Sequence, residues 1–483
     1  MLASLLQNTS SIDQSVKASH ILVVLPKLEK LPKKFEIPGE ESLNKLLVRR
    51  EMALTDLIAT PVNANLPDGE LCAWVMIDTD RTVFEQQTAL RKAIKPLLAE
   101  GPAELHIAVY GSTQQRKSFS ELAVYVAWIN GAVLPVRKNK PVRKPLAKIF
   151  LYGYKDIGNF TLQRACAEGN LLARGLTALP ANELTPATYR QQIKKLADSE
   201  GWKYQEYDLN KLREIGAGAF VAVAQGSDTE DAAIVHLQYQ CKSSSQNKTI
   251  AIVGKGICFD TGGHNLKPAR YMQGMHEDMN GSAVALGILL AATRAEIPIK
   301  IDCWLAIAQN HISPRAYKQN DIITALSGLS IEIVHTDAEG RMVLADTLTL
   351  ANKLKPDLII DFATLTGSMK TALGSRYSGI FGNREALLQK AVLAGKESGE
   401  RVCAFPMDSD YEESLESSIA DIKQCELGGE FDHILAALFL QRFVNDTPWL
   451  HLDLSASSHK DGLGAVDSEI TGFGIGWAIE FLK

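Results

Sequence analysis

The sequence His335-Thr336-Asp337-Ala338-Glu339-Gly340-Arg341 joins an apolar run, Ile331 to Val334, to the start of a helix-like pattern. Asp337 and Glu339 stand two positions apart, and on an extended strand end their side chains point the same way. Two neighbouring carboxylates repel each other unless a proton or a cation lies between them. The glycine then lets the chain turn and bring Arg341 to the same cavity. This stretch predicts a metal site with an anion site beside it, at a strand end of an α/β fold.

A second group of charged residues follows another strand candidate, Thr249 to Val253. Lys255, Asp260, Lys267 and Asp278 lie in a glycine-rich stretch that allows tight turns and close approach of the backbone. Loops that follow the parallel strands of α/β enzymes commonly carry their sites. Any one of these residues alone would most often be a solvated loop residue. Their joint spacing is what predicts a functional site.

The two stretches together resemble the signatures of the leucyl aminopeptidases, the M17 cytosol aminopeptidases. The family motif Asn-Thr-Asp-Ala-Glu-Gly-Arg matches residues 335–341, with His335 in place of the asparagine. The family's upstream motif has a lysine, an aspartate at +5, a lysine at +12 and an aspartate at +23, and residues 255, 260, 267 and 278 reproduce that spacing. The resemblance covers residues 160–483 well, whereas residues 1–150 match only in size and general pattern.

The resemblance implies a peptidase centre with two divalent metal ions per chain, Zn²⁺ or Mn²⁺, with Mg²⁺ as a further candidate. Asp260 and Glu339 would contact both ions, Asp278 and Lys255 would complete the tighter site, and Asp337 would complete the exchangeable one. Ligands rich in oxygen suit these metals, and shared carboxylates bridge a metal pair. A lysine ligand must be neutral, so the pKa of Lys255 would have to fall far below its usual value next to a dication.

The other residues of the motifs have different implied roles. Lys267 would stay charged and stabilise the oxyanion of the reaction intermediate. Arg341 cannot ligate a metal, and the resemblance implies that it holds a bicarbonate that serves as the base. The implied reaction releases N-terminal amino acids, leucine or other apolar residues, from peptides. The substrate-binding residues that the resemblance implies are Met275, Thr364, Leu365 and Gly367. The stretch Gly428–His433 departs from the family's usual small-residue loop beside the substrate pocket.

Composition is that of a globular protein without a membrane segment. The chain has 483 residues, 46% of them hydrophobic and 22% charged, and a net charge of −5 that argues against general affinity for nucleic acid. Seven scattered cysteines and the absence of a secretory signal in the first twenty residues predict a cytoplasmic protein with reduced thiols. Relatives are homohexamers, dimers of trimers, and the resemblance implies the same assembly here.

The order of apolar runs and amphipathic stretches predicts two α/β domains. We expect a smaller N-terminal domain at residues 1–150, a linker helix within 151–180, and a catalytic domain at 181–483 with a mixed, mostly parallel sheet flanked by helices. Predicted strands include Val124–Trp128 and Ala219–Ala224, and Val83–Ala99 is a predicted helix. The other predicted strands are residues 20–25, 72–77, 105–110, 148–152, 232–237, 249–253, 300–308, 331–334, 358–362 and 449–454. The other predicted helices are residues 159–179, 282–295, 341–354 and 433–444.

Two other functions are open at this point. A DNA-binding accessory protein on the same scaffold would use the basic run Arg137–Lys148, which more often is a solvated surface. A nucleotide hydrolase would use residues 111–118, which imitate a phosphate loop. Arg116 stands there where the motif requires its second glycine, so we predict an ordinary loop.

Overall fold

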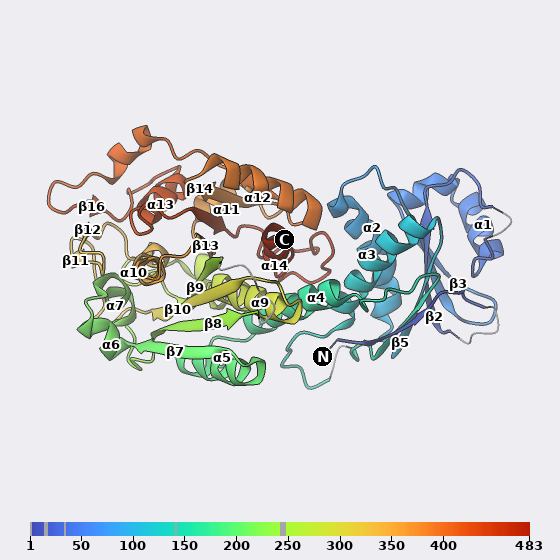
Figure 1. Cartoon of the computed structure of the whole chain (residues 1–483), viewed down its shortest axis with the longest axis horizontal. Coiled ribbons are helices and arrows are strands. Elements are labelled where there is room, and N and C mark those ends of the chain that lie inside the picture. Colours follow the sequence, from blue (N-terminus) through green and yellow to red (C-terminus); the bar gives the residue numbers. More distant parts are fainter. Residues whose placement is uncertain (1, 14–17, 33–34, 141–142, 242–247) are drawn as a thin grey trace. The chain divides into compact units, whose positions relative to one another are not determined.

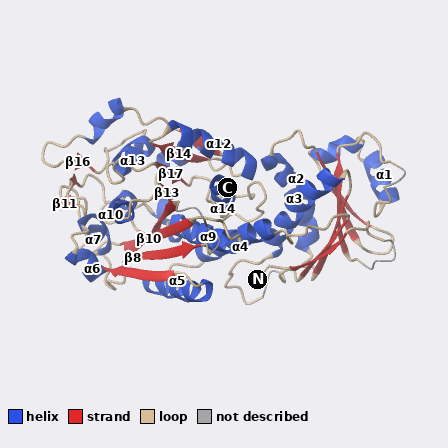
Figure 2. Cartoon of the chain, in the orientation of Figure 1, coloured by secondary structure: helices blue, strands red, loops and turns tan. Residues whose placement is uncertain are grey.

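The computed structural model describes residues 2–13, 18–32, 35–140, 143–241 and 248–483 (Figure 1). The chain forms two compact units. The first contains Met1–Leu171, Lys396–Glu400 and His459–Thr471, and the second contains Leu172–Gly395, Arg401–Ser458 and Gly472–Lys483. Both combine a sheet with covering helices, which confirms the two-domain α/β fold (Figure 2).

The first unit is built on a six-stranded sheet with helices on both faces. In spatial order its strands are β1 (Ser4–Asn8), β6 (Lys148–Tyr152), β5 (Glu104–Val109), β2 (His20–Pro26), β4 (Leu71–Ile77) and β3 (Val62–Asn65), and only β3 is antiparallel. Leu22 and Val24 of β2 pack in one core with α2 (Val83–Ala99) and α3 (Thr113–Gly131). The alternate residues Ile21 and Val23 face α1 (Glu40–Arg49) on the other side.

A late segment of the chain completes the first of these cores. Ala465 and Val466 are buried among the residues of α2 and α3. Asn130 fixes the segment, because its Nδ2 donates to Ala465 O at 2.8 Å and its Oδ1 accepts from Asp467 N at 2.8 Å. The first unit therefore needs residues from near the end of the sequence.

The second unit is built on an eight-stranded, mostly parallel sheet. Its strands in spatial order are β15 (Val402–Ala404), β14 (Ser378–Gly382), β17 (Trp449–Asp453), β13 (Leu358–Ala363), β9 (Thr249–Asp260), β10 (Lys300–Asn310), β8 (Ala233–Gln240) and β7 (Lys203–Asp208). The four central strands β17, β13, β9 and β10 are parallel to one another. A small sheet contains β11 (Ile322–Thr324), β12 (Ser330–Glu332) and β16 (Ile422–Lys423).

Helices cover both faces of the larger sheet. Ala251 and Val253 of β9 share a core with residues of α10 (Glu339–Lys353). Gly254 faces the opposite side, toward α9 (Asn280–Arg294), where a Cβ at position 254 would lie 2.5 Å from the Cα of Ser282. The carboxyl end of β9 therefore lies between the first turns of two helices, and the residues there can converge on one point.

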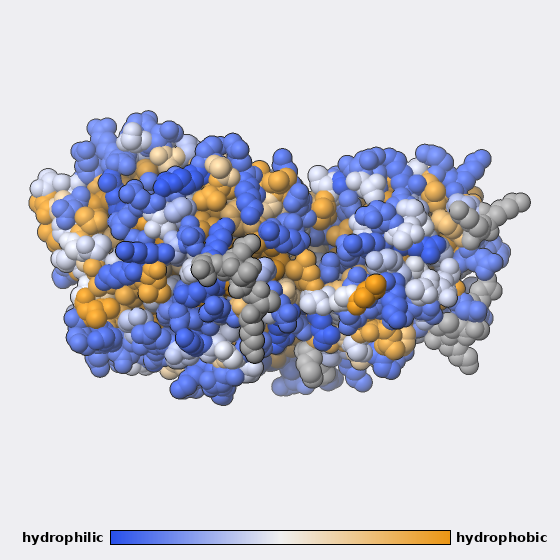
Figure 3. All heavy atoms as spheres, in the orientation of Figure 1, coloured by the Kyte–Doolittle hydropathy of each residue, from blue (hydrophilic) through white to orange (hydrophobic). Residues whose placement is uncertain are grey.

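The remaining helices are shorter or peripheral to this centre. They are α4 (Thr161–Thr177), α5 (Pro186–Glu200), α6 (Leu209–Glu214), α7 (Gly218–Ala224), α8 (Ala269–Met272), α11 (Gly367–Leu373), α12 (Glu385–Ser398), α13 (Asp432–Gln441) and α14 (Ile475–Leu482), with 3₁₀ turns η1 (Leu54–Ile58), η2 (Met275–Glu277) and η3 (Ser409–Leu415). None of the helices in the described ranges is long and apolar enough to cross a bilayer. Hydrophilic residues cover much of the face in Figure 3, with apolar patches between them.

Two predicted strands are wrong because their apolar residues belong to helices. Residues 124–128 lie inside α3, which begins at a capping box between Ser112 and Gln115 and buries apolar residues at helical spacing. Residues 113–118 are therefore the start of this helix and not part of the predicted loop. Residues 219–224 form most of α7, where three alanines favour a helix and Asp346 accepts the N–H of Phe220 at 2.8 Å.

Candidate metal centre

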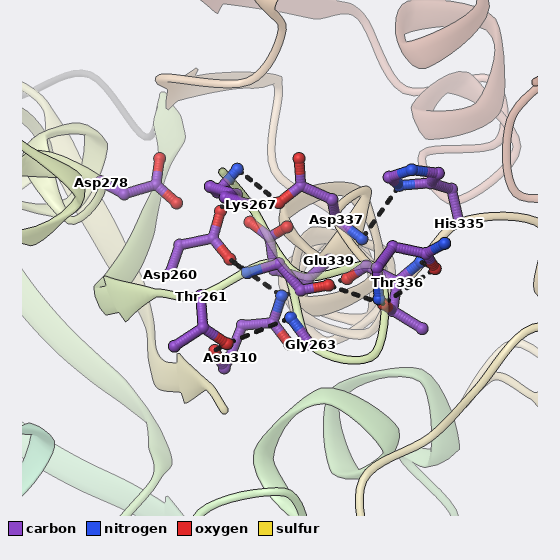
Figure 4. Close-up of polar contacts among 12 residues, drawn as sticks. Asp260, Thr261, Gly263, Lys267, Asp278, Asn310, His335, Thr336, Asp337 and Glu339 are labelled. Carbon is purple, nitrogen blue, oxygen red and sulfur yellow. Dashed lines mark hydrogen bonds and ion pairs between the residues drawn. The ribbon is translucent and has the colours of Figure 1, made fainter. Parts of the chain in front are cut away.

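Three carboxylates meet at the carboxyl edge of the larger sheet (Figure 4). Asp260 ends β9, Asp337 lies in the loop before α10, and Glu339 begins α10. Each side chain offers one carboxylate oxygen, and these three atoms lie within 4.8 Å of one another. Asp278 directly follows η2, and the side chain of Lys267 reaches the same group from the loop after β9. The structure thus gathers the charged residues whose spacing predicted a site.

Two lysines lie between these acids. Nζ of Lys255 is 2.8 Å from Oδ2 of Asp278 and 2.9 Å from Oε1 of Glu339. Burial alone would lower the pKa of Lys255, but the surrounding carboxylates outweigh it and raise the pKa above its usual value. Nζ of Lys267 is 2.9 Å from Oδ2 of Asp260 and also pairs with Asp337. Its pKa is raised for the same reason, against the opposing effect of burial.

The four carboxylates of the cluster outnumber its two lysines, and this excess of negative charge affects their pKa values. Burial, together with the neighbouring Asp260 and Glu339 carboxylates, raises the pKa of Asp337 to about 7, although Lys267 opposes the shift. The pKa values of Asp278 and Glu339 also lie above their usual range, chiefly because of burial. Four carboxylates face two ammonium groups, so the cluster favours the uptake of protons or cations.

The donor atoms fit a divalent metal. Oε2 of Glu339 is buried and has neither a hydrogen bond nor an ion pair within the described part of the chain, whereas Oδ2 of Asp278 and Oδ1 of Asp337 each face a lysine ammonium group. A buried acceptor without a hydrogen bond is costly, and a cation would satisfy it. Oxygen ligands with one amine are suited to ions such as Mn²⁺, Zn²⁺ and Mg²⁺.

Neutral side chains that the sequence did not single out hold the loops in place. Asn310, at the end of β10, pairs in register with Asp260 and donates from Nδ2 to its Oδ1 at 2.9 Å and to Thr336 O at 3.0 Å. Oγ1 of Thr336 donates to Gly262 O at 2.6 Å and accepts from the N–H of Asn265 at 2.8 Å. These bonds connect the loop after β9 to the loop before α10. The only sequence signal was a polar residue at the end of an apolar run.

Arg341 does not present a free guanidinium. It is 2% exposed, and its Nη2 donates to both carboxylate oxygens of Asp432, at 2.8 and 2.7 Å. Its Nη1 donates to Gln424 O at 3.0 Å. The pKa of Arg341 is raised, because the Asp432 carboxylate outweighs the effect of burial. The bicarbonate that the resemblance implies at Arg341 does not fit this arrangement, because another anion already occupies the guanidinium.

The expected substrate-binding residues lie at different distances from the centre. Thr364 touches it directly, since its carbonyl accepts from Lys255 at 3.0 Å and its Oγ1 donates to Oδ1 of Asp278 at 2.8 Å. Leu365 is held by Asp453, whose Oδ1 accepts its N–H at 3.0 Å. Met275 is half-buried in η2. Gly367 begins α11, and the described contacts do not connect it to the carboxylates.

His335 stands where the resembled motif has asparagine, and its imidazole ring contacts the backbone of Asp337. Its Nδ1 accepts from the N–H of Asp337 at 3.3 Å (Figure 4). Burial lowers the pKa of His335, and the Lys267 charge lowers it further. A neutral imidazole therefore lies beside the ligand loop and helps to orient it.

The fold and the site define an α/β protein with a carboxylate-rich centre for divalent cations at the edge of a parallel sheet. Residues 171–478 match the model of the cytosol aminopeptidase family, catalytic domain. The chain therefore belongs to the cytosol aminopeptidase family.

Individual relatives agree with this assignment. The chain is 43% identical over 300 residues to a probable cytosol aminopeptidase of Stutzerimonas stutzeri, a match that covers 62% of this chain and 60% of that protein. The matched part thus spans less than two thirds of that curated relative. The structure is similar to the bottromycin maturation enzyme BotP in complex with Mn, with a TM-score of 0.80 at 28% identity over 96% of this chain and 99% of that one. It is also similar to a mutant of tomato leucine aminopeptidase, with a TM-score of 0.85 at 25% identity over 99% and 96% of the two chains.

Proposed function

We propose that this protein is a metal-dependent aminopeptidase that removes N-terminal residues from peptides. The observation that carries the proposal is the group of Asp260, Asp337 and Glu339, whose oxygen atoms lie within 4.8 Å of one another and include the buried Oε2 of Glu339, which has no partner among the described residues. Family membership and the Mn-bound structural neighbour support the same reading. Two divalent ions, Zn²⁺ or Mn²⁺, are proposed, with Asp260 and Glu339 shared between them, Asp278 and Lys255 at one ion and Asp337 at the other.

The ions would supply an activated water and a Lewis acid for the peptide carbonyl. The side chains of the protein do the rest. Lys255 has to give up a proton to become a ligand, and the carbonyl of Thr364 and the carboxylate of Asp278 orient its nitrogen. Lys267 keeps its charge and is placed to stabilise an oxyanion. No bicarbonate enters this proposal, because Asp432 occupies Arg341.

Selectivity for the first residue of the peptide is proposed to depend on Met275 and on the segment Thr364, Leu365 and Gly367. Met275 and Leu365 offer apolar surface, which favours leucine and similar side chains. The stretch Gly428–His433 departs from the family's usual loop beside the substrate pocket and supplies Asp432 to Arg341, so we assign its residues to the pocket as well. Relatives named cytosol aminopeptidase support the expected cytoplasmic location.

A DNA-binding role has less support. Arg143, a member of the basic run Arg137–Lys148, donates from Nη2 to the carbonyls of Asn130 and Ala132, and is therefore committed to the fold. Residues 141–142 of that run lie outside the described residues. The nucleotide-hydrolase alternative fails on structure, because residues 113–118 are helical.

The test is hydrolysis of a panel of aminoacyl amides by metal-free protein, before and after Mn²⁺ or Zn²⁺ is added. Activity should return only with metal and should be highest for apolar residues. Asp278→Asn should lose one ion and nearly all turnover. The control Asp228→Asn changes a side chain that is 94% exposed and should behave as the wild type. Full activity of Asp278→Asn, or turnover without metal, would refute the proposal.

A further inference from the structure

The guanidinium of Arg341 is paired with a carboxylate from its own chain. The side chain of Arg341 is 2% exposed and that of Asp432 is 28% exposed, and the two are joined by hydrogen bonds of 2.8 and 2.7 Å. A buried guanidinium needs an anion, because leaving its charge unpaired is strongly destabilising. Asp432 meets that need without any dissolved ion.

The segment that carries Asp432 is held firmly on both sides. Gln424 is fully buried, its Oε1 accepts the N–H groups of Val334 and His335 at 3.3 and 3.1 Å, and its Nε2 donates to Ala338 O at 2.9 Å. Gln424 thus fixes the start of the segment to the loop that holds Asp337.

The other end of the segment is fixed to Ser368 in α11. His433 donates its N–H to Oγ of Ser368 at 2.9 Å, and its Nδ1 lies 3.0 Å from the same atom. Asp432 also begins α13, whose residues Ile434 and Leu435 are buried in the core of the second unit. The carboxylate is therefore positioned by the fold and does not depend on a flexible loop.

A dissolved anion would compete poorly for this guanidinium. A bound ion loses translational freedom, whereas the carboxylate of Asp432 is already in place. A second anion at Arg341 would also lie next to Asp432 and be repelled by it. We propose that Asp432 is a built-in anion that takes the place of bicarbonate at Arg341, so that this enzyme works without exchangeable carbonate.

Asp432 takes over the charge pairing of bicarbonate with Arg341 and not its implied role as the base. It is therefore a positioning residue, which acts through Arg341 and through the loop that Arg341 and Gln424 support. Removing its carboxylate should leave a small site lined by Arg341 that accepts a planar oxyanion such as bicarbonate or formate. The proposal rests on the proposed function only for its kinetic test, because anion binding can be measured without turnover.

The binding test uses metal-free full-length protein and titration calorimetry with sodium bicarbonate. The wild type should show no binding in the millimolar range, whereas Asp432→Ala should bind bicarbonate. Glu426→Ala removes an exposed acid from the same segment and should behave as the wild type. Melting curves check that each variant is folded, and Asp432→Asn replaces Asp432→Ala if the latter does not fold. Binding of bicarbonate by the wild type, or its absence in both folded variants, would overturn the proposal.

The kinetic test uses metal-loaded protein in buffer freed of carbon dioxide. Wild-type turnover should not respond to bicarbonate. Asp432→Ala should lose about 10²-fold in kcat, the scale expected for a misplaced catalytic group, and should recover with bicarbonate or formate. A purely structural role would give a loss that no anion restores, and that result counts against the proposal. If none of the proteins hydrolyses peptides, the proposed function fails while the binding test still decides about Asp432.

Discussion

The proton on Lys255 determines what its neighbours can bind. An ammonium group has no lone pair for a metal, so Lys255 has to lose its proton before it becomes a ligand. Burial lowers its pKa, but the carboxylates of Asp278, Glu339 and Asp260 raise it above the usual value. The group is therefore charged throughout the neutral range when no metal is bound, and metal binding has to displace a proton.

We expect the affinity for Mn²⁺ to rise with pH, by about tenfold per pH unit for each proton released. The sign follows from the raised pKa, because a lower pH favours the ammonium form that opposes the metal. Calorimetry in buffers of different ionisation enthalpy counts the released protons. Lys255→Met keeps a side chain of similar length but has no proton to release. The number of protons released on metal binding should therefore fall by about one in this variant. An affinity that does not change with pH would contradict this role.

Lys267 has a different expected effect. Lys267→Ala should lower kcat by about 10²–10³, the usual loss for one donor to an oxyanion. Its metal content should stay at the wild-type level, which elemental analysis measures. Lys318→Ala, at a side chain that is 65% exposed, is the control for loss of a positive charge. If Lys267→Ala loses a metal ion while Lys255→Ala keeps both ions, then Lys267 is the metal ligand and Lys255 is the oxyanion donor.

The sequence predicted which acids and lysines gather, because their spacing matches a known motif. It did not predict Gln424 or Asp432, whose contacts with Arg341 join residues 83 and 91 positions apart. Nothing local in the sequence indicates such a pair. Asp432 could have been suspected only from its place in a stretch that departs from the family pattern.

Among the helices and strands, the sequence predicted the helix α2 at its observed bounds, since its periodicity is strong, but it predicted only residues 249–253 of β9, which continues to Asp260 through a stretch expected to turn. It failed at α3 and α7, where short apolar runs fit a strand as well as a buried helix. In both cases, hydrogen bonds at the first residues of the segment favour the helix. Ser112 caps α3, and Asp346 accepts N–H groups where α7 begins.

Asp346 connects two helices and a turn of the second unit. It lies in α10, its Oδ2 accepts the N–H of Phe220 in α7 at 2.8 Å, and its Oδ1 accepts that of Leu326 at 2.8 Å. Asp346→Ala would leave two N–H groups without a partner, each costing about 1–3 kcal/mol of the free energy of unfolding. Urea denaturation at neutral pH measures the loss. Asp321→Ala, at a partly exposed acid, is the comparison, and an equal effect of both changes would argue against the role of Asp346.

The effect of Asp346 should depend on pH. Burial raises its pKa to about 6, above the usual 3.8, although the backbone N–H groups oppose the shift. An acid with a raised pKa in the folded state contributes most below its unfolded pKa, and this contribution is lost as the pH rises through the folded value. The stability difference between wild type and Asp346→Ala should thus be about 1 kcal/mol larger at pH 5 than at pH 8. A difference that grows with pH would contradict the shift.

At the scale of the whole molecule, we expect a homohexamer, because the family resemblance implies a dimer of trimers and closed symmetric assemblies are common. Light scattering should give a mass six times that of the 52.8 kDa chain. Asp278→Asn should keep this mass while it loses metal, which separates assembly from catalysis. A single-chain mass at micromolar concentration would disprove the hexamer.

The late segment in the first unit has a consequence for synthesis on the ribosome. Domains commonly fold in the order in which they emerge, beginning with the N-terminal one. Here Ala465 and Val466 fill the core between α2 and α3, and the side-chain amide of Asn130 bonds to that same segment and to its own helix. The N-terminal unit therefore cannot close its core until residues 459–471 have been translated. A nascent chain that stalls before residue 459 would expose apolar surface to chaperones and proteases.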